Sequence, residues 1–403
     1  MLDLNQIENA YKRIKKVVHK TPFTNAPILS NLSGYDVYLK KENLQITGAF
    51  KLRGAFNCIA SMVEKGNNKG VVGASAGNHA QGVAFSAKYF GIDATIIMPE
   101  STPLTKIEGV RGFGAKVILK GNNYDEAYAY AINYAEEKSL DFIHPFTNID
   151  VMAGQGTVAI EMLDEIENLD AIIVPIGGGG LISGVATAVK AINPKCKIIG
   201  VSSKGAPAMA LSYKEQKVIN SKSVRTIADG IAVRDTSPTT LEYILKYVDE
   251  VQMIGEDEIA NAILFLLEKQ KILVEGAGAV GVALLMHNKL NLPKGSRIGI
   301  ILSGGNIDVT MLSLIIEKGL VKSSRKMKLI VTLIDKAGSL MQLTKLLQEV
   351  DANIVQIGYD RTSTDLKFGD ANVSVDLETK GIYHQEEIRE SLTNNKFSFI
   401  EEH

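Results

Sequence analysis

A lysine stands among small and apolar residues in the segment GAFKLRGA, residues 48–55. The chain's 44 lysine and arginine residues are otherwise mostly scattered among acidic and amide residues. Burial disfavours the charged form of a lysine and lowers the pKa of its amine, which is what a Schiff-base amine needs. Lys51 is therefore a candidate reactive lysine, although most lysines extend from a helix start into solvent.

Four consecutive glycines, residues 177–180, follow the apolar run AIIVPI and precede LISGVATAV. With no side chains in the way, successive backbone N–H groups can converge on an anion at the start of a helix. The segment lacks the Lys-Ser or Lys-Thr pair of a P-loop and the spacing of a dinucleotide-binding motif. It predicts a phosphate-binding loop, and a flexible tight turn is the alternative.

Two further turns carry polar groups. In ASAGNHAQGVA, residues 74–84, the start of a helix offers backbone donors to a carboxylate, and the Asn78 amide can reach a phenolic oxygen. A plain helix cap is the alternative. In LSGGNID, residues 302–308, Ser303 ends an apolar run. A phosphate loop together with a Schiff-base lysine implies pyridoxal 5'-phosphate.

The sequence around these residues alternates between segments with the residue pattern of a helix and short apolar runs typical of a strand. Helical stretches at 124–138 and 157–166 lie between short apolar runs. This alternation predicts an α/β fold with a largely parallel sheet, whose ligands bind at the carboxyl ends of the strands. The runs read as buried strands are residues 70–75, 93–99, 115–120, 170–176, 196–202 and 297–303.

Composition limits the classes of function. A chain of 403 residues predicts two or three domains, and a net charge of -1 provides no field for nucleic acid or an anionic membrane. Cys58 and Cys196 form no metal or disulfide motif. The sequence contains neither a signal peptide nor a spanning segment. We expect a cytoplasmic protein with a small-molecule partner and no nucleic-acid or membrane partner.

The pattern changes after Ser323. Residues 328–335, 339–350, 353–361, 370–379, 385–393 and 397–401 predict the order βαββαβ, which is that of a ferredoxin-like domain. The basic, serine-containing segment at 317–328 is typical of a linker.

Five segments, in this order, resemble the serine/threonine dehydratases, pyridoxal-phosphate enzymes of fold type II: ENLQITGAFKLRGA, SAGNHAQG, PIGGGGLISG, VEGAGAVG and SGGNID. The resemblance extends to about residue 320 and is strongest to the threonine ammonia-lyases with one regulatory domain. It implies two α/β open-sheet subdomains in residues 1–322, the smaller one inserted at about 54–155. A linker at 323–327 and a ferredoxin-like domain of the ACT family at 328–403 would follow.

The resemblance also implies roles for single residues. Lys51 would hold pyridoxal 5'-phosphate, with Phe50 beside its ring, Asn78 at the 3'-oxygen and Ser303 at the ring nitrogen. Glu275 would lie near the cofactor or else serve only as a helix-start carboxylate. The phosphate would bind Gly177, Gly178, Gly179, Gly180 and Leu181, and the substrate would bind Ser75, Ala76, Gly77, Asn78 and His79, of which His79 is interpreted mainly as a packing residue.

The activity implied is the β-elimination of L-threonine to 2-oxobutanoate and ammonia. L-Serine remains an alternative substrate, since one methyl group is worth only about 1 to 3 kcal/mol of discrimination. A pyridoxal-phosphate protein that senses a metabolite without catalysis also remains open. Ala76 stands where serine-racemising relatives carry a serine, so we expect little racemisation.

Two more expectations come from the resemblance. Residues 201–209, VSSKGAPAM, lack the carboxylate with which some relatives bind a divalent cation, so no metal is expected there. ACT domains bind an amino-acid effector at the turn that here contains Gly338, usually across a dimer interface. We expect a homodimer or homotetramer with such an effector, and an assembly module without a ligand is the alternative.

Overall fold

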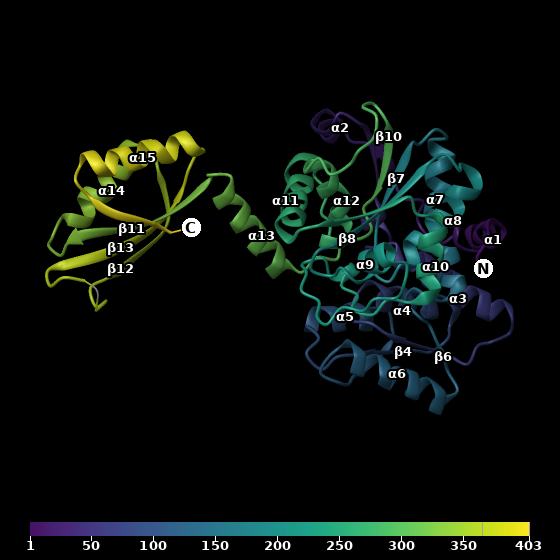
Figure 1. The fold of residues 1–403 in the computed structure, drawn as a ribbon. Helices are drawn as coiled ribbons and strands as arrows, with labels where there is room; N and C mark the ends of the chain where they lie inside the picture. Colours follow the sequence, from purple (N-terminus) through teal and green to yellow (C-terminus); the bar gives the residue numbers. More distant parts are fainter. Residues whose placement is uncertain (365, 403) are drawn as a thin grey trace. The chain divides into compact units, whose positions relative to one another are not determined.

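The computed structural model describes residues 1–364 and 366–402. The chain forms two compact units, Met1–Asp308 and Val309–His403 (Figure 1). None of the helices in these described residues is long and apolar enough to cross a membrane.

The larger sheet of the first unit has the strand order β1-β2-β10-β7-β8-β9. β1 pairs antiparallel with β2, and the other neighbours are parallel. The strands are β1 (Phe23–Asn25), β2 (Asp36–Lys40), β7 (Ala171–Pro175), β8 (Lys197–Ser203), β9 (Glu250–Ile254) and β10 (Arg297–Ile301).

The smaller sheet has the order β5-β4-β3-β6, and all its pairs are parallel. It lies in the part of the chain where an inserted subdomain is expected. Its strands are β3 (Val71–Ala74), β4 (Ala94–Met98), β5 (Lys116–Leu119) and β6 (Asp141–Phe142).

Helices connect these parallel strands. The α-helices of residues 1–308 are α1 (Leu4–Ile14), α2 (Pro27–Ser33), α3 (Lys51–Glu64), α4 (Asn78–Phe90), α5 (Leu104–Gly112), α6 (Tyr124–Lys138), α7 (Ile149–Glu165), α8 (Gly180–Ile192), α9 (Ala208–Glu215), α10 (Pro238–Tyr247), α11 (Glu256–Phe265) and α12 (Gly276–Met286). Short 3₁₀ turns are η1 (Glu42–Leu44) and η2 (Asp229–Ile231), and a π-helical turn is η3 (Leu266–Gln270).

Both faces of the smaller sheet are covered (Figure 1). Val71 and Ile96 pack with apolar residues of α3, α4 and α5. Val72 and Ile97 point the other way and pack against the alanines of α6. Side chains alternate between the two faces of a strand, so the continuous apolar runs of the sequence follow from burial on both sides.

The structure confirms the six predicted strands as β3, β4, β5, β7, β8 and β10. The helix predicted at 124–138 is α6, whereas that at 157–166 is only the second half of α7. The first half of α7, IDVMAGQG, contains two glycines that weaken a helical prediction. They are needed for close packing, because a Cβ on Gly154 would lie 2.4 Å from the Arg53 carbonyl oxygen.

A fully buried ionic cluster holds α3 against the rest of the unit. Arg53 donates to both carboxylate oxygens of Glu42 and to both of Glu161, each at 2.8 Å. Lys40 donates to Glu161 at 2.6 Å and to the Thr21 carbonyl oxygen at 2.7 Å. Two cations therefore balance two anions, and the cluster joins β2, η1, α3 and α7.

The second unit contains α13 (Val309–Lys322), β11 (Lys326–Ile334), α14 (Ser339–Glu349), β12 (Asn353–Asp360), β13 (Asp370–Glu378), α15 (Ile382–Asn394) and β14 (Ser398–Glu402). The predicted βαββαβ order is present, and the strands form an antiparallel sheet with the order β12-β13-β11-β14. The units divide at residue 308, before the boundary expected at 322, because α13 belongs with the second unit. Residues 326 and 327 of the expected linker lie in β11.

We predict that Arg53→Met lowers the free energy of unfolding by about 3 to 5 kcal/mol, since it leaves two buried carboxylates with one lysine. Urea unfolding followed by circular dichroism measures this loss. Arg13→Met is the control, because Arg13 pairs with Glu64 at a partly exposed site and should cost about 1 kcal/mol or less. Equal losses in the two variants would contradict the assigned importance of the cluster.

Candidate active site

A cavity of about 1030 Å³ lies where strands of both sheets end. Ser75 follows β3, His144 follows β6, Gly177 follows β7 and Ser303 follows β10. Gly338 belongs to the second unit and does not line this cavity. All the other predicted site residues do: Phe50, Lys51, Ser75, Ala76, Gly77, Asn78, His79, Gly177, Gly178, Gly179, Gly180, Leu181, Glu275 and Ser303.

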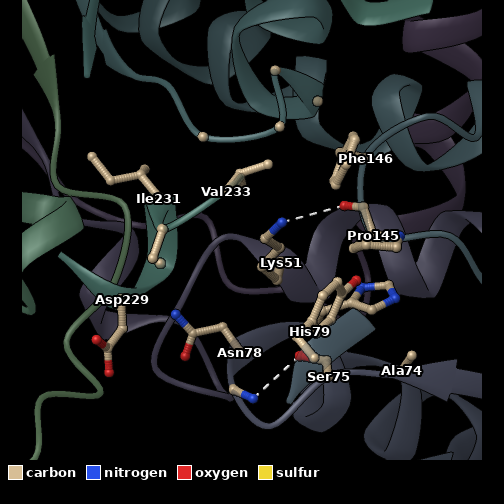
Figure 2. A pocket seen from close by; sticks show the side chains of 18 of the residues that line it. Lys51, Ala74, Ser75, Asn78, His79, Pro145, Phe146, Asp229, Ile231 and Val233 are labelled. Carbon is tan, nitrogen blue, oxygen red and sulfur yellow. Dashed lines mark hydrogen bonds between the residues drawn. The ribbon is translucent and has the colours of Figure 1, made fainter. Parts of the chain in front are cut away.

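Lys51 is the first residue of α3, and its amine points into the cavity (Figure 2). Nζ donates a hydrogen bond to the Pro145 carbonyl oxygen at 3.2 Å. It also lies 5.3 Å from the centre of the Phe50 ring. Burial lowers the pKa of Lys51 to about 8, although the negative charge of Glu275 partly opposes this shift. The unprotonated fraction of the amine near neutral pH is therefore far larger than that of an exposed lysine.

The tetraglycine loop follows β7 and leads into α8. A Cβ on Gly178 would lie 2.4 Å from the Phe146 ring, and one on Gly177 would lie 2.8 Å from the Ile231 Cα. Gly179 adopts a φ of 89°, which favours glycine. The first N–H groups of α8 have no partner within the helix, so the loop provides a cradle for an anion.

Asn78 begins α4, and its amide is held by two side chains. Its Nδ2 donates to both carboxylate oxygens of Glu275 at 3.0 Å. Its Oδ1 accepts from Asn306 Nδ2 at 2.7 Å, and the same Asn306 nitrogen donates to the Thr47 carbonyl oxygen. These contacts turn the donating end of the Asn78 amide toward Glu275.

Asn306 is a residue that the sequence reasoning missed. It stands in SGGNID, a segment in which the sequence pattern indicates a role only for Ser303. Its amide is the only sequence signal for a contact with Asn78. The two residues are 228 positions apart, so the sequence does not show that they meet.

Glu275 is the N-cap residue of α12 and is buried. Its carboxylate lies close to two glycines, since a Cβ on Gly304 or Gly230 would come within 2.6 or 2.7 Å of Oε1. Burial raises the pKa of Glu275, while the hydrogen bond from Asn78 and the charge of Lys51 act in the opposite direction. Both roles expected for Glu275, at the cavity and at a helix start, are thus compatible with its position.

The turn between β3 and α4 provides backbone donors. The N–H of Gly77 donates to Ser75 Oγ at 3.2 Å (Figure 2). His79 is buried, and its Nε2 lies 2.8 Å from the Ile143 carbonyl oxygen. Burial and the charge of Lys51 lower the pKa of His79 to about 3, so the ring is neutral. This position agrees with a packing role.

Ser303 is buried at the end of β10 beside the lysine segment. Its carbonyl oxygen accepts the N–H of Phe50 at 3.0 Å, and Ala49 bridges to Gly304. This pairing brings Ser303 next to Lys51, although 252 positions separate them in the sequence.

The segment His144–Pro145–Phe146 is also missing from the sequence prediction. It joins β6 to α7 and contacts both the lysine and the glycine loop. Its only sequence signal is a histidine, a proline and an aromatic residue after a two-residue strand, which is too common to indicate a site.

Among the described residues, no group of three or more histidine, cysteine, aspartate or glutamate side chains could hold a metal ion. The segment 201–209 contains no carboxylate of its own, but in the folded chain a carboxylate from another segment contacts it. Glu256 accepts hydrogen bonds from the Ser203 hydroxyl, the Thr226 hydroxyl and the Ile227 N–H.

The residues present fit pyridoxal 5'-phosphate. Residues 177–180 place no side chain at the start of α8, where the N–H groups can meet an anion, and Lys51 is a partly buried amine with a lowered pKa. Ser303 offers a neutral hydroxyl at the same cavity. An anion cradle and an amine in one cavity are the two features that the cofactor requires.

The family model for pyridoxal-phosphate dependent enzymes matches residues 14–304. An L-threonine ammonia-lyase of Thermotoga maritima is 46% identical over 392 residues, which cover 97% of both chains. A catabolic L-threonine dehydratase of Staphylococcus aureus is 44% identical over 79% of this chain and 93% of its own.

Solved structures show the same architecture. Maize serine racemase superposes with a TM-score of 0.74 at 37% identity, covering 80% of this chain and 98% of its own. Threonine deaminase isoform 2 of Solanum lycopersicum has a TM-score of 0.74 at 36% identity, covering 78% and 86%.

We predict that Glu275→Gln lowers the pKa of Lys51 below about 8, because it removes the negative charge that favours the ammonium form. The pH dependence of amine acylation at Lys51 in the cofactor-free protein, followed by mass spectrometry, measures this pKa. Glu258→Gln is the control, since Glu258 pairs with Lys289. An unchanged or raised pKa in the Glu275 variant would show that the two groups do not interact.

Proposed function

The chain belongs to the pyridoxal-phosphate-dependent enzyme family, and we propose that it catalyses the β-elimination of L-threonine to 2-oxobutanoate and ammonia. Its cofactor is pyridoxal 5'-phosphate. The observation that carries the proposal is Lys51, an amine with a lowered pKa in a cavity that also contains an anion cradle. Curated relatives with this activity support the choice of reaction.

The bound cofactor withdraws electrons from the substrate Cα and so makes its proton acidic. Lys51 would hold the cofactor covalently at rest and, once released, its free amine would accept the Cα proton. With a pKa of about 8, Lys51 can both accept and return a proton near neutral pH.

The remaining contacts would anchor the two molecules. Backbone N–H groups of residues 177–181 would hold the phosphate, and Phe50 would pack beside the ring. Asn78 would donate to the 3'-oxygen through Nδ2, which donates to Glu275 in this structure, while its amide oxygen accepts from Asn306. The start of α4, residues 75–79, would bind the substrate carboxylate.

Ser303 would meet the ring nitrogen with a hydroxyl. A hydroxyl cannot keep a proton on that nitrogen as a carboxylate would, so charge on the substrate carbon is less delocalised. Elimination, in which the charge leaves at once with the β-substituent, is then favoured over transamination. At the cavity wall Ala76 offers no proton-carrying side chain, so racemisation should be weak.

We predict that Lys51→Ala gives a folded protein that lacks the absorbance band of a lysine-bound cofactor and releases no 2-oxobutanoate from L-threonine. Parallel assays with L-serine and pyruvate as the product establish the substrate preference. Lys15→Ala, at an exposed position, is the control and should behave like the unmodified chain. Turnover in the Lys51 variant would remove the lysine from its role, and absence of turnover in the unmodified chain would favour a non-catalytic sensor.

The second unit is proposed to be an ACT domain that binds an amino-acid effector. Its βαββαβ order and antiparallel sheet support this. Gly338, with a φ of 92°, is exposed between β11 and α14, so its backbone is open to a ligand. In this proposal a pair of chains shares the effector, and the enzyme is a homodimer or homotetramer.

We predict that residues 1–308 alone keep the cofactor and most of the maximal rate but lose any response to isoleucine or valine. The proposed cofactor and substrate residues all lie before residue 309, and an effector acts only through a different affinity for two states. Rates with and without each amino acid, in this fragment and in the full chain, measure the effect. A fragment that responds like the full chain, or one that binds cofactor but is inert, would contradict the prediction.

A further inference from the structure

His144 lies between β6 and α7, in a segment to which no sequence motif assigned a function. The segment contacts both anchors of the site. Pro145 accepts the hydrogen bond from Lys51, and the Phe146 ring occupies the space beside Gly178. His144 lines the same cavity and is only partly buried.

Two backbone groups determine which ring nitrogen of His144 carries the hydrogen. Nδ1 accepts the N–H of Phe146 at 3.2 Å and that of Thr147 at 3.0 Å. A nitrogen that accepts cannot also donate, so the hydrogen of the neutral ring is on Nε2. Among the described residues no hydrogen-bond partner is found for Nε2, which leaves its N–H to a molecule in the cavity.

The ring is also held in place and stays neutral. It makes edge-to-face contacts with Phe146, Tyr128 and Phe142 at centroid distances of 4.6, 5.9 and 6.2 Å. Burial, followed by the charge of Lys51, lowers the pKa of His144 to about 4. His144 is therefore a rigid, uncharged donor at neutral pH.

Apart from Lys51, the lysine and arginine side chains that line the same cavity are already paired with carboxylates. Lys106 lies 3.2 Å from Asp229, and Arg234 lies 2.7 Å from Asp125. The N–H groups at the start of α4 are better suited to bind a substrate carboxylate. A single neutral donor suits an uncharged hydroxyl.

We propose that His144 is a positioning residue that donates its Nε2 hydrogen bond to the β-hydroxyl oxygen of the substrate. This rests on the proposed β-elimination of L-threonine. His144 keeps its proton, and the hydroxyl leaves as water with the proton that Lys51 has taken from Cα. The contribution of His144 is to orient the departing oxygen and to stabilise the negative charge that develops on it before that proton arrives. It also favours substrates that carry the hydroxyl group.

Two variants separate the two functions of the ring. In His144→Asn the amide oxygen can replace Nδ1 as the acceptor of the two backbone N–H groups, but nothing donates where Nε2 stood. In His144→Gln the longer amide can place a donor near the Nε2 position and leaves the backbone groups without their acceptor. The Asn variant thus tests the donor, and the Gln variant tests its rescue.

The experiment compares leaving groups in the cofactor-loaded enzyme. We expect His144→Asn to lower kcat/KM for L-threonine and L-serine by about 10- to 100-fold. Elimination from β-chloro-L-alanine should change by no more than about threefold, because departing chloride needs no hydrogen bond to a hydroxyl. His144→Gln should recover part of the activity with L-threonine.

Binding provides a readout apart from turnover. L-2-aminobutyrate lacks the hydroxyl, so its dissociation constant, measured from the cofactor absorbance, should be the same in the Asn variant and the unmodified chain. An equal loss of L-threonine and β-chloro-L-alanine activity, or no loss of either, would overturn the role of His144. If the Asn variant does not fold, the same comparison in His144→Gln decides, and an equal loss there overturns the role too. An unmodified chain that does not act on L-threonine would instead refute the proposed function.

Discussion

The burial of an amine without a carboxylate in direct contact is the constraint on which the site depends. Lys51 has a backbone carbonyl as its hydrogen-bond partner, and Glu275 interacts with it only through its charge. A carboxylate in direct contact would stabilise the ammonium form and raise the pKa, whereas burial lowers it to about 8. The surrounding structure must therefore keep carboxylates away from one lysine while holding it firmly.

Arg53 holds the segment that contains Lys51 in place. It lies two residues beyond Lys51 on α3 and pairs with two buried glutamates, one of which also pairs with Lys40. The close approach of α7, made possible by Gly154, presses the same turn against the core. The contrast between Lys51 and Arg53 has a physical basis, because a buried charge is tolerated when it is paired, and an unpaired amine gives up its proton more readily. The reactive amine and the arginine of the ionic cluster thus belong to one short segment, KLR.

The cavity requires both sheets. The smaller sheet contributes the start of α4 and the segment after β6, and the larger sheet contributes the glycine loop and Ser303. Hydrogen bonds between Asn78, Glu275 and Asn306 join the two parts. Because the ligand site lies between the parts, each contact across it also orients a group toward the ligand.

The sequence by itself determined the strands and the turns that follow them. Apolar runs and glycine clusters are local features, so the six main strands, the glycine loop and Lys51 could be read directly. It could not determine the ionic cluster, the contact of Asn306 with Asn78, or the hydrogen on His144 Nε2. Each of these depends on atoms brought together from distant positions, such as Glu161 at Arg53 and Phe146 beside the glycine loop. Only the packed structure decides which polar groups lose water and which partner replaces it, and that choice sets their charge, their orientation and their chemistry.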